Sequence, residues 1–332
     1  DRDEGAVLGL IDAEIWTRND GPTPRRNRLP FNDKESARWL RGVERANERL
    51  SAAREVITIG DRESDIYALF ARRPEGSQLI VRAQHNRKTT QTWLFEDALD
   101  MPVLGDVEVA IAARPGQKAR TARIRLKAGT ATLTRPADSV DRNDPAEVRL
   151  NIVIAAEQHP PQGVKPVIWR LLTTLPIRSR EEAEEVVRLY RLRWRIEEVF
   201  RTLKSDGLDL EATQIEEAQR LFKLAALGIA AAVRIVQLVD ARDGSARPAT
   251  DVTDPSLFDA MEAIGRTLEG KTERQQNPHE KGSLAWLSWI AARLGGWNCY
   301  YKPPGPKTMA TGWKQLAAMT AGFILAKAEP DV

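Results

Sequence analysis

Cysteine is nearly absent from this 332-residue chain, which contains only Cys299. A single cysteine excludes a disulfide framework within the chain and is typical of proteins from a reducing compartment. Histidine is scarce as well, and His85, His159 and His279 stand far apart in the sequence. This scarcity argues against a zinc site built on histidines and against a Ser-His-Asp triad.

Long apolar runs are also missing. No stretch reaches the roughly 18 apolar residues that a membrane-spanning helix needs, and the sequence has no signal peptide, so we expect no membrane partner. Charge is abundant instead, with 29% charged residues and a net charge of +3. This balance is compatible with a phosphate-bearing partner, because a small net charge can hide local basic patches. At 332 residues the chain can form two or three domains.

The most informative stretch is 190–204, YRLRWRIEEVFRTLK. Four polar side chains in it, Tyr190, Arg193, Glu197 and Lys204, recur at offsets that bring them onto one side of a helix. At ~100° per residue they fall on one narrow stripe, roughly 21 Å long. Apolar side chains repeat on a different face, which we expect to face the core. These are Leu189, Leu192, Ile196, Val199 and Leu203.

Two interpretations of the polar stripe are open from the helix alone. A carboxylate among cations and a phenol can bind a metal ion and a phosphate. Alternatively, the stripe is a solvated helix face with i,i+4 pairs such as Arg193–Glu197.

A second polar feature follows a short strand without a polar face, 56–60 (VITIG), as expected in a sheet covered on both sides. Asp61 lies where this strand ends and a helix over 66–73 begins. Ligands of open α/β sheets bind at that edge. The alternative is that Asp61, Ser64 or Asp65 merely caps the helix.

The remaining patterns predict a mixed α/β chain. Residues 6–16 form an apolar run typical of a buried strand, and a helix is expected up to about Leu50. Alternating segments between Gln78 and Ala156 predict antiparallel strands, followed by one more strand that contains Trp169. A tryptophan in such a strand is most often part of the core, and it can stack on a base only if it projects from the sheet. Ser179 is expected to start the helix that runs on to Lys204.

The last third of the sequence predicts helices. The run 218–241 is apolar almost throughout, so we expect that helix to be buried. An amphipathic helix should end at Gly295–Gly296, where glycines are a typical C-cap. A final helix is expected from about Trp313.

This order of elements resembles the ribonuclease-H-like fold of DDE transposases, with a β insertion between the second and third acidic residues. The chain is similar to the IS-four type of bacterial insertion-sequence transposases. The family motif Y-x2-R-x3-E-x6-K is matched by Tyr190, Arg193, Glu197 and Lys204. Residues 61–66 match the motif D-R-E-x-D-I, and 81–88 (VRAQHNRK) and 169–173 (WRLLT) resemble its basic strand and its Trp-bearing hairpin.

The resemblance implies a fold class and four parts. It implies an α/β, ribonuclease-H-like catalytic core interrupted by an antiparallel β insertion, with an all-α C-terminal region. Residues 1–77 would be the first part of the core and 78–177 the inserted sheet. Residues 178–245 would complete the core, and 246–332 would form a C-terminal region used for dimerisation.

The resemblance also implies roles for single residues. Asp61 and Glu197 would be catalytic carboxylates that hold two Mg²⁺ or Mn²⁺ ions roughly 4 Å apart. Tyr190, Arg193 and Lys204 would grip the phosphate beside a flipped nucleotide, on whose base Trp169 would stack. The DNA path would be lined by Arg82, His85, Arg87 and Lys88. Gln84 stands where the family has a basic residue, so one DNA contact would be missing.

The implied function is cut-and-paste transposition in the bacterial cytoplasm, in association with the nucleoid. The protein would nick transposon ends, form a hairpin intermediate and join the 3′-OH to target DNA, working as a homodimer on double-stranded DNA. The dimer contacts would lie at about 283–326.

One element of the family pattern is missing. The family places its first catalytic aspartate on a strand before residue 6, and Asp1, Asp3 and Asp12 do not fit that place. We therefore expect the chain to be an N-terminally truncated fragment. Two alternatives follow: a catalytically inactive remnant that binds DNA ends or inhibits a transposase, and another ribonuclease-H-like nuclease.

Overall fold

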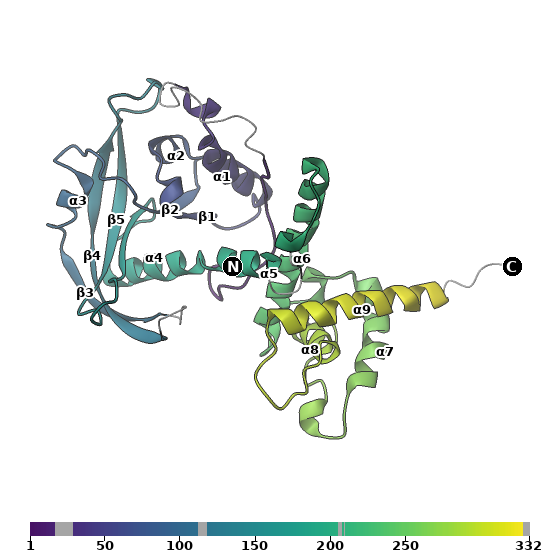
Figure 1. The fold of residues 1–332 in the computed structure, drawn as a ribbon. Coiled ribbons are helices and arrows are strands. Elements are labelled where there is room, and N and C mark those ends of the chain that lie inside the picture. The colour runs from purple at the N-terminus through teal and green to yellow at the C-terminus, as the bar shows by residue number, and fades with distance from the viewer. Residues whose placement is uncertain (17–28, 112–117, 205–207, 209, 328–332) are drawn as a thin grey trace. The chain divides into compact units, whose positions relative to one another are not determined.

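The structure of the protein is a computed structural model that describes residues 1–16, 29–111, 118–204, 208 and 210–327. The chain divides into two compact units (Figure 1). One, which we call the sheet unit, spans Arg18–Arg193. The other, the helical unit, combines Asp1–Thr17 with Trp194–Val332. The four-part division expected from the sequence stays a prediction.

A single six-stranded sheet organises the sheet unit, with strand order β1-β2-β6-β5-β4-β3. The strands β1 and β2 are parallel, and every other neighbouring pair is antiparallel. The bounds are β1 Ile57–Gly60, β2 Gln78–Arg82, β3 Val103–Ile111, β4 Arg120–Thr134, β5 Glu147–Glu157 and β6 Ile168–Thr173. The antiparallel strands expected after residue 78 are therefore present, and they continue the sheet that β1 and β2 begin.

Helices cover both faces of this sheet. On one face α1 (Ala37–Arg49), α2 (Tyr67–Arg72) and α3 (Leu94–Asp97) pack against the strands, and on the other α4 (Arg180–Leu192) does. Successive residues point to opposite faces, so Leu172 joins the first core and Leu171 the second. The strand expected before Asp61 is present as β1, whose Ile57 and Ile59 pack partly buried against the core beneath α4.

The helix expected up to about Leu50 is present as α1. Ala37, Leu40 and Val43 are its buried residues, as the spacing of the apolar positions requires. The helix α4 begins where expected, with the Ser179 hydroxyl accepting a hydrogen bond from the Glu182 N–H at 3.3 Å.

The expected buried strand at 6–16 is wrong. This segment forms no strand, and Leu8 and Leu10 are 58% and 45% exposed. Its backbone is instead hydrogen-bonded to a side chain of α6 in the same unit: the Leu8 carbonyl accepts a hydrogen bond from Gln237 Nε2 at 2.8 Å. A short apolar run has the same composition whether it pairs with a strand or lies along a helix, so composition alone could not separate the two.

The expected continuous helix through 190–204 is also wrong. It ends at Leu192 as α4 and resumes as α5 (Arg195–Lys204), with a turn at Arg193–Trp194. The apolar positions divide accordingly, with Leu189 in a core of the sheet unit and Val199 in a core of the helical unit. Leu203 joins Val199, whereas Ile196 is 49% exposed and faces no core. No glycine or proline marks the break, so the sequence pattern gave no signal of it.

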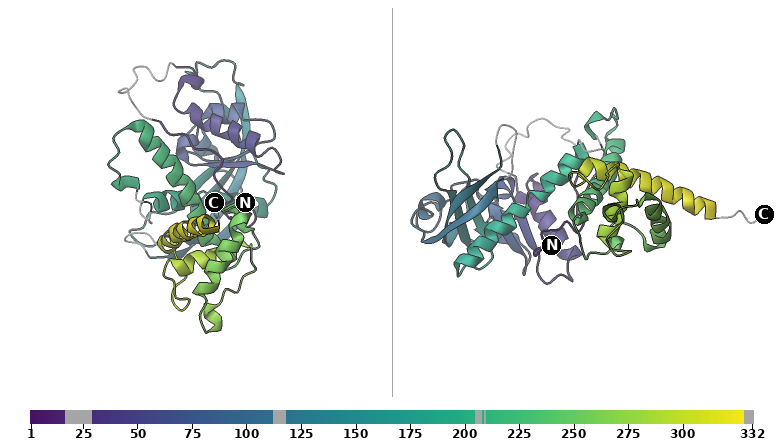
Figure 2. Two further views of the ribbon diagram at one scale, coloured as in Figure 1. Left: turned by 90° about the vertical axis from the view of Figure 1, so that its right-hand side faces the viewer. Right: turned by 90° about the horizontal axis from the view of Figure 1, so that it is seen from below.

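The helical unit is built around α8 (Leu284–Leu294), in which every residue from Leu284 to Ala292 is buried. It contacts α6 (Ala218–Ala241), α7 (Phe258–Leu268) and α9 (Pro306–Lys327) (Figures 1 and 2). Gly295 is its C-cap, as expected.

The helix α6 is only partly buried, which corrects the expectation for 218–241. Its buried residues begin at Ala232. Leu227, which lies closer to the N-terminus of the helix, is 72% exposed. By length and composition α6 would be able to cross a membrane, but the core helix of a non-membrane protein passes the same test.

Candidate functional site

Asp61 stands at the carboxyl end of β1, where the parallel pair β1–β2 opens. Its side chain accepts a hydrogen bond from the Arg62 N–H at 2.9 Å and so caps a short 3₁₀ turn, Arg62–Ser64. The cap uses one oxygen only, and the side chain remains 39% exposed. Asp61 thus caps the 3₁₀ turn and not the helix α2, whose N-cap is Ile66, and a ligand-binding role for its exposed carboxylate stays a prediction.

Three side chains from other elements converge on this carboxylate. The Tyr190 hydroxyl, from α4, donates to Asp61 Oδ1 at 3.3 Å. Arg193 and Arg82 place guanidinium nitrogens 3.6 Å and 4.0 Å from the carboxylate oxygens. The structure thus brings together four residues that the sequence singled out, from β1, β2 and the end of α4. A hydroxyl and two guanidinium groups that surround a carboxylate in this way are also suitable donors for a phosphate.

The pKa of Tyr190 is raised above its usual value. Burial is the main cause, and the negative charge of Asp61 adds to it, while Arg82 and Arg193 oppose it. The phenol therefore stays protonated at neutral pH and remains a hydrogen-bond donor.

Trp169 belongs to the same cluster. It lies on β6 with its ring centroid 5.6 Å from that of Tyr190, in an edge-to-face arrangement. The indole is partly buried against the core beneath α4. Trp169 is thus a wall of the site that supports Tyr190, and one part of its surface stays accessible.

Residues after β2 complete the edge of the sheet. His85 and Lys88 are exposed, whereas Arg87 is directed inward and is 14% exposed. Arg87 binds Asp65, whose side chain is fully buried. The second oxygen of Asp65 accepts the N–H groups of Gln84 and His85 at 2.7 and 2.9 Å.

Asp65 holds the edge of the sheet together, although the sequence pattern indicated only that it could cap a helix. It ties the loop after β2 to the turn that carries Asp61, because it bonds three residues of that loop. Its membership of the segment DRESDI was the available signal, but only tertiary contacts identify its partners. The DNA-contacting role expected for Arg87 stays a prediction.

Glu197 and Lys204 lie on α5 in the helical unit, both exposed. Lys204 Nζ is 3.0 Å from Glu211 Oε1, a surface ion pair that contributes little to stability. Because these two residues belong to the other unit, their place relative to Asp61 stays a prediction.

A divalent metal ion fits the chemistry of these carboxylates. Among the residues that the structure describes, no three His, Cys, Asp or Glu side chains form a cluster able to hold a metal on their own. Mg²⁺, however, usually binds one or two carboxylates together with substrate phosphates and water. The half-exposed oxygens of Asp61 are suitable for such a shared site.

One comparison with known proteins bears on this cluster. A family model described as "Transposase DDE domain" matches residues 32–234, more than half of the chain. The match includes Asp61, Trp169, Tyr190 and Glu197.

Proposed function

The chain belongs to the transposase DDE domain family, and from that premise we propose that it is a cut-and-paste transposase of the IS-four type. It would cleave double-stranded DNA at transposon ends and join them to target DNA. The observation that supports this most is the convergence of Tyr190, Arg193 and Arg82 on the carboxylate of Asp61. A phosphate-gripping set and a metal-binding acid are what hydrolysis of a phosphodiester needs in one place.

The family generally uses divalent metal ions, and Asp61 and Glu197 would hold Mg²⁺ or Mn²⁺ here. Bound metal would lower the pKa of a water molecule or a DNA 3′-OH and stabilise the leaving oxygen.

The cations around Asp61 would act on DNA. In the absence of DNA, Arg82 and Arg193 lie near the carboxylate. When a phosphate enters, the planar guanidinium groups can bind it bidentately, leaving Asp61 to the metal. Lys204 would contribute a point charge, Trp169 a stacking surface, and His85, Arg87 and Lys88 contacts along the duplex.

The proposed dimer would bring two DNA ends together through 283–326. Sedimentation with and without end DNA tests it, and a complex that contains one copy of the chain would contradict it.

The catalytic assignment is tested by cleavage of end-labelled duplex DNA from the ends of the element that encodes the protein. We expect Asp61→Asn and Glu197→Gln to abolish cleavage by the protein, while duplex binding is retained. Glu75→Gln, which changes an exposed carboxylate after α2, is the matched control and should cleave normally. Full cleavage by either site variant would exclude the assignment. Binding of end DNA by the wild-type protein without cleavage would favour the inactive, end-binding alternative.

A further inference from the structure

The first turn of α5 carries Glu197, and its apolar side chain, Ile196, belongs to none of the cores formed by the described residues. Because the helix breaks at Arg193–Trp194, α5 is not held by the hydrogen-bond ladder of α4. Its later turns pack on α6, where Val199 and Leu203 share a core with Ala232. Ile196, in the first turn, is 49% exposed. Contacts of another kind must therefore fix the first turn.

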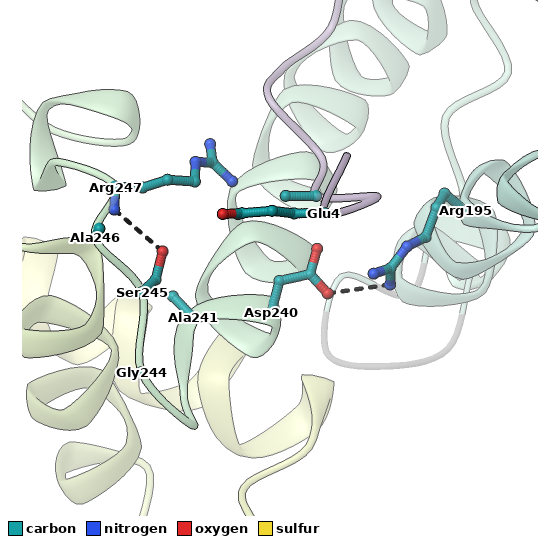
Figure 3. A pocket seen from close by; sticks show the side chains of 9 residues that line it. Glu4, Arg195, Asp240, Ala241, Gly244, Ser245, Ala246 and Arg247 are labelled. Carbon is teal, nitrogen blue, oxygen red and sulfur yellow. Dashed lines mark hydrogen bonds and ion pairs between the residues drawn. The ribbon is translucent and has the colours of Figure 1, made fainter. Parts of the chain in front are cut away.

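Arg195 supplies those contacts. Its guanidinium lies 3.0 Å from Asp240 Oδ1 on α6 (Figure 3). The same group lies 2.7 Å from Glu198 Oε2 on α5 itself. Its Nε donates to the Gly5 carbonyl at 3.3 Å. One side chain at the start of α5 therefore joins that helix to α6 and to the N-terminal segment, all within the helical unit.

Asp240 is the fixed end of this connection. Its side chain is 14% exposed, and its second oxygen accepts the Val7 N–H at 3.5 Å. It borders a cavity of about 450 Å³ that is also lined by Glu4 and Arg247 (Figure 3). Burial raises the pKa of Asp240, and the charge of Arg195 partly opposes this rise. Asp240 is therefore held between α5 and the N-terminal segment, since one oxygen meets Arg195 and the other meets the Val7 N–H.

We propose that Asp240 is a positioning residue for Glu197, which acts by holding Arg195 and with it the first turn of α5. Glu197 is two residues from Arg195, so a shift of that turn moves the carboxylate directly. A misplacement of about 1 Å can slow a reaction roughly 100-fold, which is why a remote ion pair can matter. The inference rests on the proposed catalytic role of Glu197.

The test is the rate of single-turnover cleavage at saturating end DNA, measured beside the dissociation constant for the same duplex. Asp240→Asn keeps the size of the side chain and removes its charge, and we expect a rate roughly 10- to 100-fold lower with unchanged affinity. Asp240→Glu should recover part of the rate. A purely structural role would instead lower the melting temperature and leave the rate of the folded fraction unchanged.

Asp251→Asn is the matched control. Asp251 pairs with Arg247 at 2.7 Å in the same unit, away from α5, and its side chain is 28% exposed against 14% for Asp240. We expect its cleavage rate to stay within about twofold of wild type, since surface and half-buried pairs of this kind contribute modestly. A rate as low as that of Asp240→Asn would overturn the inference.

Hydrogen exchange gives a second readout that does not need catalysis. The N–H groups of Glu197 and Glu198 bond to the Trp194 carbonyl at 3.0 and 3.3 Å. They should exchange faster in Asp240→Asn, while amides of α8 stay unchanged. Unchanged exchange at α5, or cleavage at the wild-type rate, would overturn the inference. Cleavage by Glu197→Gln would overturn the proposed function instead, a result distinct from any outcome with Asp240.

Discussion

Removal of the Asp65 carboxylate should destabilise the sheet unit strongly. The side chain is fully buried and accepts hydrogen bonds from the N–H groups of Gln84 and His85 and from Arg87 Nε at 3.0 Å. Asp65→Ala leaves these three donors without their acceptor and leaves Arg87 as a nearly buried, unpaired charge. Loss of one partner of a buried pair costs about 3–5 kcal/mol.

Asp65→Asn separates the charge from the hydrogen bonds. The amide oxygen can still accept from the two backbone N–H groups, so the loss should be about 2 kcal/mol, the size of one charge-assisted hydrogen bond. Asp106→Ala is the control, because Asp106 is likewise a carboxylate paired with arginine, here Arg123 and Arg125, but near the surface. Its loss should be much smaller, since solvent screens such pairs.

Urea unfolding followed by far-UV circular dichroism measures these differences as shifts of the midpoint at constant slope. The expected order of destabilisation is Asp65→Ala, then Asp65→Asn, then Asp106→Ala. The reasoning is refuted if Asp65→Ala unfolds at the wild-type midpoint, or if Asp106→Ala is the least stable of the three.

Three further predictions concern other parts of the chain. Gly312→Ala should lower the melting temperature, because a Cβ there would lie 1.7 Å from the Ala291 carbonyl oxygen, and such overpacking costs about 1–3 kcal/mol or more; an unchanged melting temperature contradicts this. The guanidinium of Arg120 holds the pKa of Glu157 below its usual range, so the stability that Glu157 provides is present above pH 4.5, its ordinary value, and is lost as the pH falls through the lowered pKa. Thermal melts should therefore show wild type and Glu157→Gln converging in acid, and a gap that widens in acid would contradict this sign. Arg193→Ala should weaken DNA binding and reduce the slope of log affinity against log salt by about 1 in a fluorescence-anisotropy titration, whereas an unchanged slope would argue against a phosphate contact.

Much of the sheet unit followed from local sequence patterns. The strand before Asp61 and the antiparallel segments after it were readable because alternation and turn residues are local properties. The meeting of Tyr190, Arg193 and Asp61 was expected only from the family resemblance, since residues so far apart in sequence carry no local record of contact.

Other features could not be read from local patterns. The break between α4 and α5 falls in a stretch whose residues all suit a helix. Local propensity therefore gives no sign of it, and only the packing of the two helices against different cores goes with the break. The N-terminal half of α6 and the segment 6–16 are only partly covered, and they show the same limit, because apolar composition does not say which surface will cover a segment. Asp65 and Asp240 have roles defined by distant partners. The segment DRESDI singles out Asp65 but not its partners, and nothing in the sequence around Asp240 distinguishes it from a surface carboxylate.

The most direct test of a metal-binding Asp61 is a change of ligand from oxygen to sulfur. A thiolate binds Mg²⁺ poorly and softer ions such as Mn²⁺ better. The Asp61→Cys variant should therefore fail to cleave end DNA in Mg²⁺ and regain cleavage in Mn²⁺, whereas Asp61→Ala should stay inactive with both ions. Cleavage by Asp61→Ala at the wild-type rate in Mg²⁺ would contradict the role assigned to this carboxylate.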